Sequence, residues 1–152
     1  MLIVIAAPAK GTTFVNGNYK YKITKAAAGS KAGAVTLVGP VKKTLKAIVV
    51  PDTVNIGVKY NVTAIGPKAF MNNKKATKVT IGKNVTQIGA NAFAGCKKAK
   101  TYVIKSAKIK KIGAKAFNKT KKGAKFKVPK KMIKKYRKMI IKAKAKAPKV
   151  TK

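Results

Sequence analysis

The sequence predicts a mainly β solenoid, a fold in which short coils of chain stack along one axis. A turn with one apolar skeleton occurs three times, as IGPKAFMNNKK from Ile65, IGANAFAGCKK from Ile88 and IGAKAFNKTKK from Ile112. The three starting positions lie 23 and 24 residues apart, a spacing typical of solenoid repeats. Each turn also follows a short segment in which apolar and polar residues alternate. Together these observations indicate that each coil has a strand, a turn, a second short strand, a glycine corner and a short helical turn that ends in Phe.

The strands of the coils are predicted from the segments LKAIVVP, ATKVTIG, AKTYVIK and GAKFKVP, because alternating apolar residues indicate a strand with one buried face. Glycines 66, 89 and 113 mark sharp corners or close approaches between coils. One coil cannot bury its own apolar face, so stacked coils must bury it together. We therefore expect a buried structural core built from Ile65, Phe70, Ile88, Phe93, Ile112 and Phe117.

The segments on either side of the repeats are predicted to cap the stack. In TTFVNGNYKYKI the pair Asn16–Gly17 lies between alternating segments, which favours a tight β-hairpin. With AVTLVG it would form an N-terminal β cap over residues 12–44, followed by the solenoid over 45–128. A capping helix is expected over 129–147, because apolar residues recur there at helical spacing on one face. Residues 148–152 are expected to be a frayed basic tail.

The repeat resembles the BspA-like leucine-rich repeat family of bacterial surface proteins over about residues 45–128. The resemblance rests on the elements xxVxIG, xxVxxIGxxAF and xGCKK, and the hairpin and VPKKMIKKYRKMI are similar to family flanks. It implies a secreted or wall-associated, non-catalytic binding or adhesion domain. Two departures stand out: alanine replaces the usual leucine at Ala76 and Ala99, and NIGVKY is inserted before Val62. The first suggests a thinner core, and the second a loop or hairpin of its own.

The balance of charge is extreme, since 38 lysines and arginines stand against Asp52 alone and no histidine is present. The formal net charge is +37 at pH 7. Charges closer than a Debye length of about 8–10 Å are only partly screened at physiological salt. The fold must therefore tolerate repulsion or take negative charge from a partner, and a polyanion is the partner expected.

The composition excludes a paired-carboxylate or triad mechanism, and no lysine is singled out as a nucleophile. General acid–base and nucleophilic mechanisms draw on His, Glu, Asp or an activated Cys, and this chain has one Asp, one Cys, no Glu and no His. Metal ligands are too few for a zinc, calcium or magnesium site, and no P-loop pattern occurs. We expect no enzyme activity, no catalytic residue, no metal and no cofactor. Cys96 is expected to be a buried small hydrophobe.

The candidate binding site is a row of lysine pairs that follow the phenylalanine turns. Because these pairs recur at the repeat spacing, stacking should align them on adjacent coils. A face that needed only solubility would mix charges of both signs. We expect this row, called the lysine stripe below, to be the polyanion site, and it comprises Lys74, Lys75, Lys97, Lys98, Lys121 and Lys122.

We expect the lysines to recognise their ligand by its negative charge alone. Lysines are compact point charges, and Arg137 is the only planar guanidinium in the chain. Aromatic residues fall at core positions and not among the lysines, which disfavours a platform for stacking bases. The candidates are wall teichoic acid, an acidic glycan, an acidic surface protein or nucleic acid bound non-specifically. Two alternatives stay open. One is a structural subunit that forms a homo-oligomer, an extracellular fibre or a surface layer, and the other is an engineered cationic scaffold.

The location expected from the resemblance is extracellular or at the bacterial cell surface. No stretch of sequence reaches the roughly 20 apolar residues of a membrane span. Residues 1–11, beginning MLIVIAAPAK, are expected to be the remnant of a secretory leader or an N-terminal strand. If retained, this apolar segment could supply a strand to a neighbouring molecule.

Overall fold

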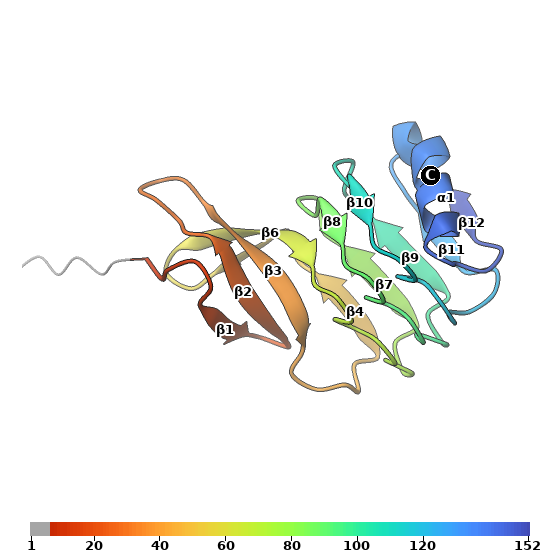
Figure 1. Cartoon of the computed structure of the whole chain (residues 1–152), viewed down its shortest axis with the longest axis horizontal. Helices are drawn as coiled ribbons and strands as arrows, with labels where there is room; N and C mark the ends of the chain where they lie inside the picture. The colour runs from red at the N-terminus through yellow and green to blue at the C-terminus, as the bar shows by residue number, and fades with distance from the viewer. Residues whose placement is uncertain (1–6) are drawn as a thin grey trace, which may run out of the picture.

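A computed structural model describes residues 7–152 and is mainly β, with 36% of residues in strands and 9% in helices. It is an elongated stack with a hairpin cap at one end and a helix at the other (Figure 1). One sheet of seven strands has the order β1-β2-β3-β6-β8-β10, with β5 paired to β6. A second sheet of five strands has the order β12-β11-β9-β7-β4. The predicted mainly β solenoid with two caps is confirmed.

The N-terminal cap is the predicted hairpin together with a third strand. Strands β1 (Thr13–Asn16) and β2 (Tyr19–Lys25) pair antiparallel around Gly17, whose φ is 59°. Strand β3 (Gly33–Pro40) pairs antiparallel with β2 and parallel with β6 (Lys59–Ile65). It therefore joins the cap to the first coil, as AVTLVG was expected to do. The prediction for residues 1–11 falls mostly outside the described residues.

The insertion in the first coil forms a hairpin of its own, as predicted. Strand β5 (Thr53–Asn55) pairs antiparallel with the start of β6. Gly57, with a φ of 93°, lies in the connecting turn, where the Asn55 side chain accepts a hydrogen bond from its N–H at 2.9 Å.

The coils stack through two rows of parallel strands. The first row comprises β4 (Ala47–Val50), β7 (Lys78–Ile81), β9 (Thr101–Ile104) and β11 (Lys125–Lys127). The second continues from β6 through β8 (Gln87–Ile88) to β10 (Lys111–Ile112). We call residues 47–75, 78–98 and 101–122 the first, second and third coils. The second and third coils each contribute one strand to each sheet, and the first coil adds β5 beside β6. The core lies between the sheets.

The phenylalanine turns form the predicted buried column. Phe70 and Phe93 stack with ring centroids 5.5 Å apart, and Phe93 and Phe117 stack at 5.7 Å. Tyr19 closes the column from the N-terminal cap with its ring edge against Phe70. Ile65 and Ile88 are buried as expected, but Ile112 is only half-buried. It lies on β10, the last strand of its sheet, so no further coil covers it.

Glycine at the corners is required by close packing between coils. A Cβ on Gly89 would lie 2.5 Å from the Pro67 nitrogen, and one on Gly113 would collide with the Ala90 nitrogen. The Gly89 N–H donates to the Ile65 carbonyl at 2.8 Å, and the Gly113 N–H donates to the Ile88 carbonyl at 2.7 Å. These corners are close approaches between adjacent coils, as the sequence predicted.

The C-terminal end differs in part from the sequence prediction. The capping helix is shorter than 129–147, with a 3₁₀ turn η1 (Lys130–Met132) followed by α1 (Ile133–Lys142). Its apolar face is buried as predicted, through Tyr136 and Ile140. The tail expected to fray instead forms strand β12 (Lys149–Thr151), which pairs parallel with β11. Val150 is buried in this strand, which explains why the segment is ordered.

Candidate functional site

The six stripe lysines occupy the same place on three neighbouring coils. Strand β7 pairs with β9, and β9 with β11, at offsets of 23 and 24 residues. The lysine pairs are separated by the same offsets, so strand register aligns them. Hydrogen bonds join adjacent coils just before the pairs, from the Asn72 N–H to the Ala94 carbonyl and from the Gly95 N–H to the Asn118 carbonyl.

Buried residues on both sides turn the first two lysine pairs outward. Asn73 precedes the first pair and Cys96 the second, and both are buried. Ala76 and Ala99 follow these pairs and are fully buried. All six stripe lysines are exposed. Because adjacent strands lie about 4.8 Å apart, the stripe places exposed ammonium groups on three successive levels.

Hydrogen bonds beneath the stripe hold its turns in place. The Asn73 side-chain oxygen accepts the backbone N–H groups of Lys75 at 3.1 Å and Ala76 at 3.0 Å. The Cys96 thiol donates to the Phe70 carbonyl at 3.2 Å and so links the second coil to the first. Burial raises the pKa of the Cys96 thiol to about 12. Cys96 is therefore a buried, unreactive thiol at neutral pH, in agreement with the sequence prediction.

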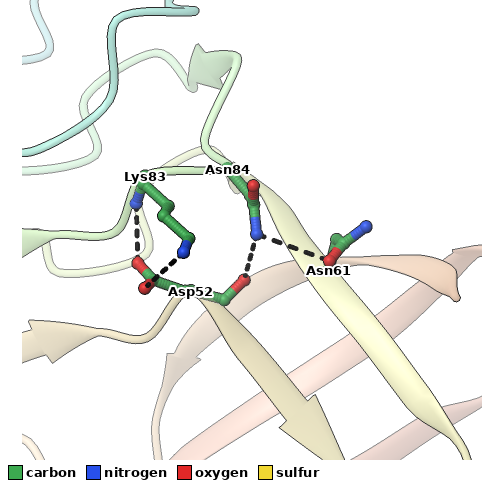
Figure 2. Close-up of polar contacts among 4 residues, drawn as sticks. All are labelled: Asp52, Asn61, Lys83 and Asn84. Carbon is green, nitrogen blue, oxygen red and sulfur yellow. Dashed lines mark hydrogen bonds and ion pairs between the residues drawn. The ribbon is translucent and has the colours of Figure 1, made fainter.

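The single acid lies elsewhere and has a structural role, which Figure 2 shows. One Asp52 carboxylate oxygen accepts the backbone N–H of Lys83 at 2.7 Å, and the other is 3.9 Å from the Lys83 ammonium. The Asn84 amide donates to the Asp52 carbonyl at 3.0 Å. Asp52 thus fastens the first coil to the second. It does not neutralise the stripe.

A second basic surface is found at the C-terminal end, where sequence reasoning assigned no site. Two adjoining hollows lie between the third coil and the capping helix, and they share Lys110 and Met139. We call their lysine-lined surface the basic hollow. It is lined by Lys110, Lys111, Lys115, Lys131, Lys134, Lys135, Lys138, Lys142 and Lys144. The pairs Lys110–Lys111 and Lys134–Lys135 are visible in the sequence, but their convergence depends on how the helix docks.

The described residues contain no cluster of three or more potential metal ligands. Among the helices of residues 7–152, none combines the length and apolar character needed to cross a bilayer. The described surface presents many exposed lysine ammonium groups.

Comparison with known proteins places the fold in a family. The model of the BspA type leucine rich repeat region matches residues 45–146 with six copies. This chain belongs to the BspA-type leucine-rich repeat family. The match runs beyond residue 128, the expected end of the solenoid, into the capping helix. No match was found among curated protein sequences.

Solved structures show the same fold. A leucine rich cell surface protein from Faecalibacterium prausnitzii is 30% identical, with a TM-score of 0.58, over 72% of this chain and 28% of that one. A leucine-rich repeat protein from Bacteroides ovatus is 24% identical, with a TM-score of 0.55, over 77% of this chain and 35% of that one. A leucine-rich repeat protein from Bacteroides capillosus is 22% identical, with a TM-score of 0.51, over 71% of this chain and 91% of that one. This chain thus spans only about a third of the length of the Faecalibacterium and Bacteroides ovatus proteins.

Proposed function

We propose that this protein is a non-catalytic, strongly cationic repeat domain of the bacterial cell surface that binds anionic polymers through the lysine stripe. The observation that carries the proposal is the alignment of three exposed lysine pairs on successive coils. Such a row of charges matches a linear polyanion, which can contact every level at once.

The cost of assembling these charges supports a partner that supplies negative charge. Two unit charges 4 Å apart repel by about 1 kcal/mol even in bulk water. The stripe has no acid to offset this repulsion, since Asp52 is bound to the backbone of Lys83. A bound polyanion would relieve the repulsion and release its own counterions, so binding should weaken steeply as salt rises.

The ligand class follows from the kind of contact that the stripe offers. Lysine ammonium groups contact phosphate or carboxylate without fixing its orientation. Phe70, Phe93 and Phe117 are buried in the core and cannot stack on bases. Wall teichoic acid, an acidic glycan or an acidic surface protein fits this surface, and nucleic acid would bind without sequence preference. The family and the cell surface protein from Faecalibacterium favour an extracellular location.

The first experiment identifies the partner class. The full chain, immobilised at near-physiological salt, is offered isolated wall polymers, acidic glycans and nucleic acid separately. Retention of a wall polymer or acidic glycan in preference to nucleic acid supports the proposal. Failure to retain any of the three contradicts it.

The second experiment tests the location of the site. Lys74, Lys75, Lys97 and Lys98 are changed to Glu. The control changes four exposed lysines near the N-terminal end of the stack, Lys20, Lys22, Lys31 and Lys59, to Glu. Both variants lose the same net charge. The stripe variant should bind the retained polymer at least ten-fold more weakly than the control variant. Equal losses would mean that total charge, and not the stripe, is responsible.

A second candidate function, a fibre or surface-layer subunit, draws on the two outer edges of the five-stranded sheet. Both edges are partly occupied by side chains of the same molecule. The Tyr19 hydroxyl accepts the outward N–H of Val49 on β4 at 2.8 Å, and Arg137 donates to the outward carbonyl of Val150 on β12 at 3.3 Å. Blocked edges of this kind disfavour pairing between molecules, so we rank this candidate second.

The fibre candidate is tested by freeing one edge. Arg137→Ala exposes the Val150 carbonyl, and light scattering measures molecular mass against protein concentration. Under the polymer-binding proposal the wild-type protein stays monomeric at all concentrations, and association is confined to the variant. Wild-type assembly into long particles would favour the structural function.

A further inference from the structure

The basic hollow differs from the rest of the solenoid because only the third coil carries lysines just before its glycine corner, at Lys110 and Lys111. Strand pairing aligns Lys111 with Gln87 and Gln87 with Ala64. The Lys110 N–H donates to the Thr86 carbonyl and the Thr86 N–H to the Thr63 carbonyl, which aligns these three residues too. The two positions are therefore uncharged on the first and second coils. The concentration of charge at this corner is local and does not follow from bulk composition alone.

The capping helix adds lysines on the facing side. Lys131, Lys134, Lys138 and Lys142 follow one another at intervals of three or four residues, which places them on one side of the helix. Like charges at such intervals destabilise a helix, as do cations near its N-terminus. The first turn has no acid to compensate. The helix therefore keeps an arrangement that is unfavourable without a bound anion.

The wall of the hollow is fixed by a buried tyrosine. The Tyr136 hydroxyl donates to the Ser106 carbonyl at 2.8 Å and accepts the Ile109 N–H at 3.0 Å. Tyr136 lies on α1, and Ile109 directly precedes Lys110. This pair of hydrogen bonds holds the helix at a set position against the third coil, so the facing lysines belong to a preorganised surface. The half-buried side chains of Ile112 and Met139 contribute its apolar part.

We propose that the basic hollow is a second anion site, separate from the stripe, that binds a compact oligophosphate. The hollow is bounded by the helix and by the corner of the third coil, and its lysines come from both sides. A ligand with several phosphates close together can contact both groups of lysines simultaneously. A long polymer, in contrast, is better matched to the open row of the stripe. This inference goes beyond the proposed polymer binding and does not depend on it.

The test uses inorganic tripolyphosphate and the full chain in titration calorimetry at near-physiological salt. The hollow variant carries Lys110→Gln, Lys142→Gln and Lys144→Gln, and the control carries Lys20→Gln, Lys22→Gln and Lys59→Gln. Both lose three positive charges. We expect saturable binding at one site on the wild-type protein, a loss of at least ten-fold in the hollow variant and less than three-fold in the control. Equal losses, or no saturable site, would overturn the proposal.

A stripe variant separates the two proposals. Changing Lys74, Lys97 and Lys121 to Gln should weaken polymer binding and leave tripolyphosphate affinity within three-fold of wild type. Loss of tripolyphosphate binding in this variant would overturn the separate site. Polymer binding that fails while tripolyphosphate still binds the hollow would instead contradict the proposed function alone.

A measurement on the unaltered chain guards against misfolding of the hollow variant. With methionine methyl groups labelled for NMR, tripolyphosphate should shift the Met139 signal in a saturable manner. Met71, on the first coil, is the internal control and should not move. Shifts of equal size at both methyl groups, or none at Met139, would overturn the assignment.

Discussion

The lysine stripe and the basic hollow are both built from exposed lysines, but they arise in different ways. The stripe repeats one position of the coil on three levels, so strand register alone aligns it. The hollow brings residues 110–115 of the third coil against residues 131–144 of the cap, and its lysines at positions 110 and 111 have no charged counterpart on the other coils. In a repeat protein, regular surfaces can thus be inferred from sequence spacing, whereas surfaces at the ends depend on how the caps dock.

The largest expected effect removes the core that both surfaces share. Phe93 is fully buried between Phe70 and Phe117. Phe93→Ala should lower the free energy of unfolding by about 3–5 kcal/mol, the usual cost of emptying a buried phenylalanine site. Denaturant titration of the wild-type and variant proteins measures the two free energies of unfolding. A loss well under 3 kcal/mol would mean that the stacked column does not support the fold.

A smaller change should affect the hollow and spare the stripe. Tyr136→Phe removes the hydroxyl that satisfies the buried Ile109 N–H and the Ser106 carbonyl. We expect a loss of about 1–3 kcal/mol in unfolding free energy, because these groups are left without partners. Tripolyphosphate should bind more weakly while affinity for an anionic polymer stays the same. If both affinities fell together, the two surfaces would not be independent.

The smallest expected effect concerns backbone strain at the turns. Asn72 and Lys119 occupy equivalent positions two residues after the phenylalanine, both with left-handed φ angles, of 61° and 54°. Asparagine tolerates this conformation better than lysine does. Lys119→Asn should therefore stabilise the fold by up to about 1 kcal/mol, measured as a rise in the denaturation midpoint. Because Lys119 belongs to neither surface, binding of both ligands should be unchanged.

Much of the fold could be predicted because the repeat imposes it. The phenylalanine column, the close glycine corners and the two caps follow from spacing and from the need to bury an apolar face. The half-buried state of Ile112 could not be foreseen, because it depends on β10 being the last strand of its sheet. The order of residues 149–151 was also missed, since one buried residue, Val150, and pairing with β11 are a weak signal in a lysine-rich segment.

The two candidate binding surfaces also differ in how far the sequence predicts them. The outward position of the stripe lysines is implied by the apolar residues around them, whereas the hollow depends on the contact between Tyr136 and the third coil. The structural role of Asp52 was equally hidden, because its partner Lys83 lies 31 residues further along the chain.

The most direct test of the central claim, that register builds the polymer site, is the salt dependence of binding to an oligothymidine of defined length, used as a uniform polyanion. Each lysine that contacts a single-stranded phosphate contributes about 0.7 to the slope of log affinity against log salt. Changing all six stripe lysines to Gln should reduce the slope by about 4. A matched variant with Lys10, Lys20, Lys22, Lys25, Lys31 and Lys59 changed to Gln should leave the slope nearly unaltered. Equal reductions in the two variants would contradict the claim.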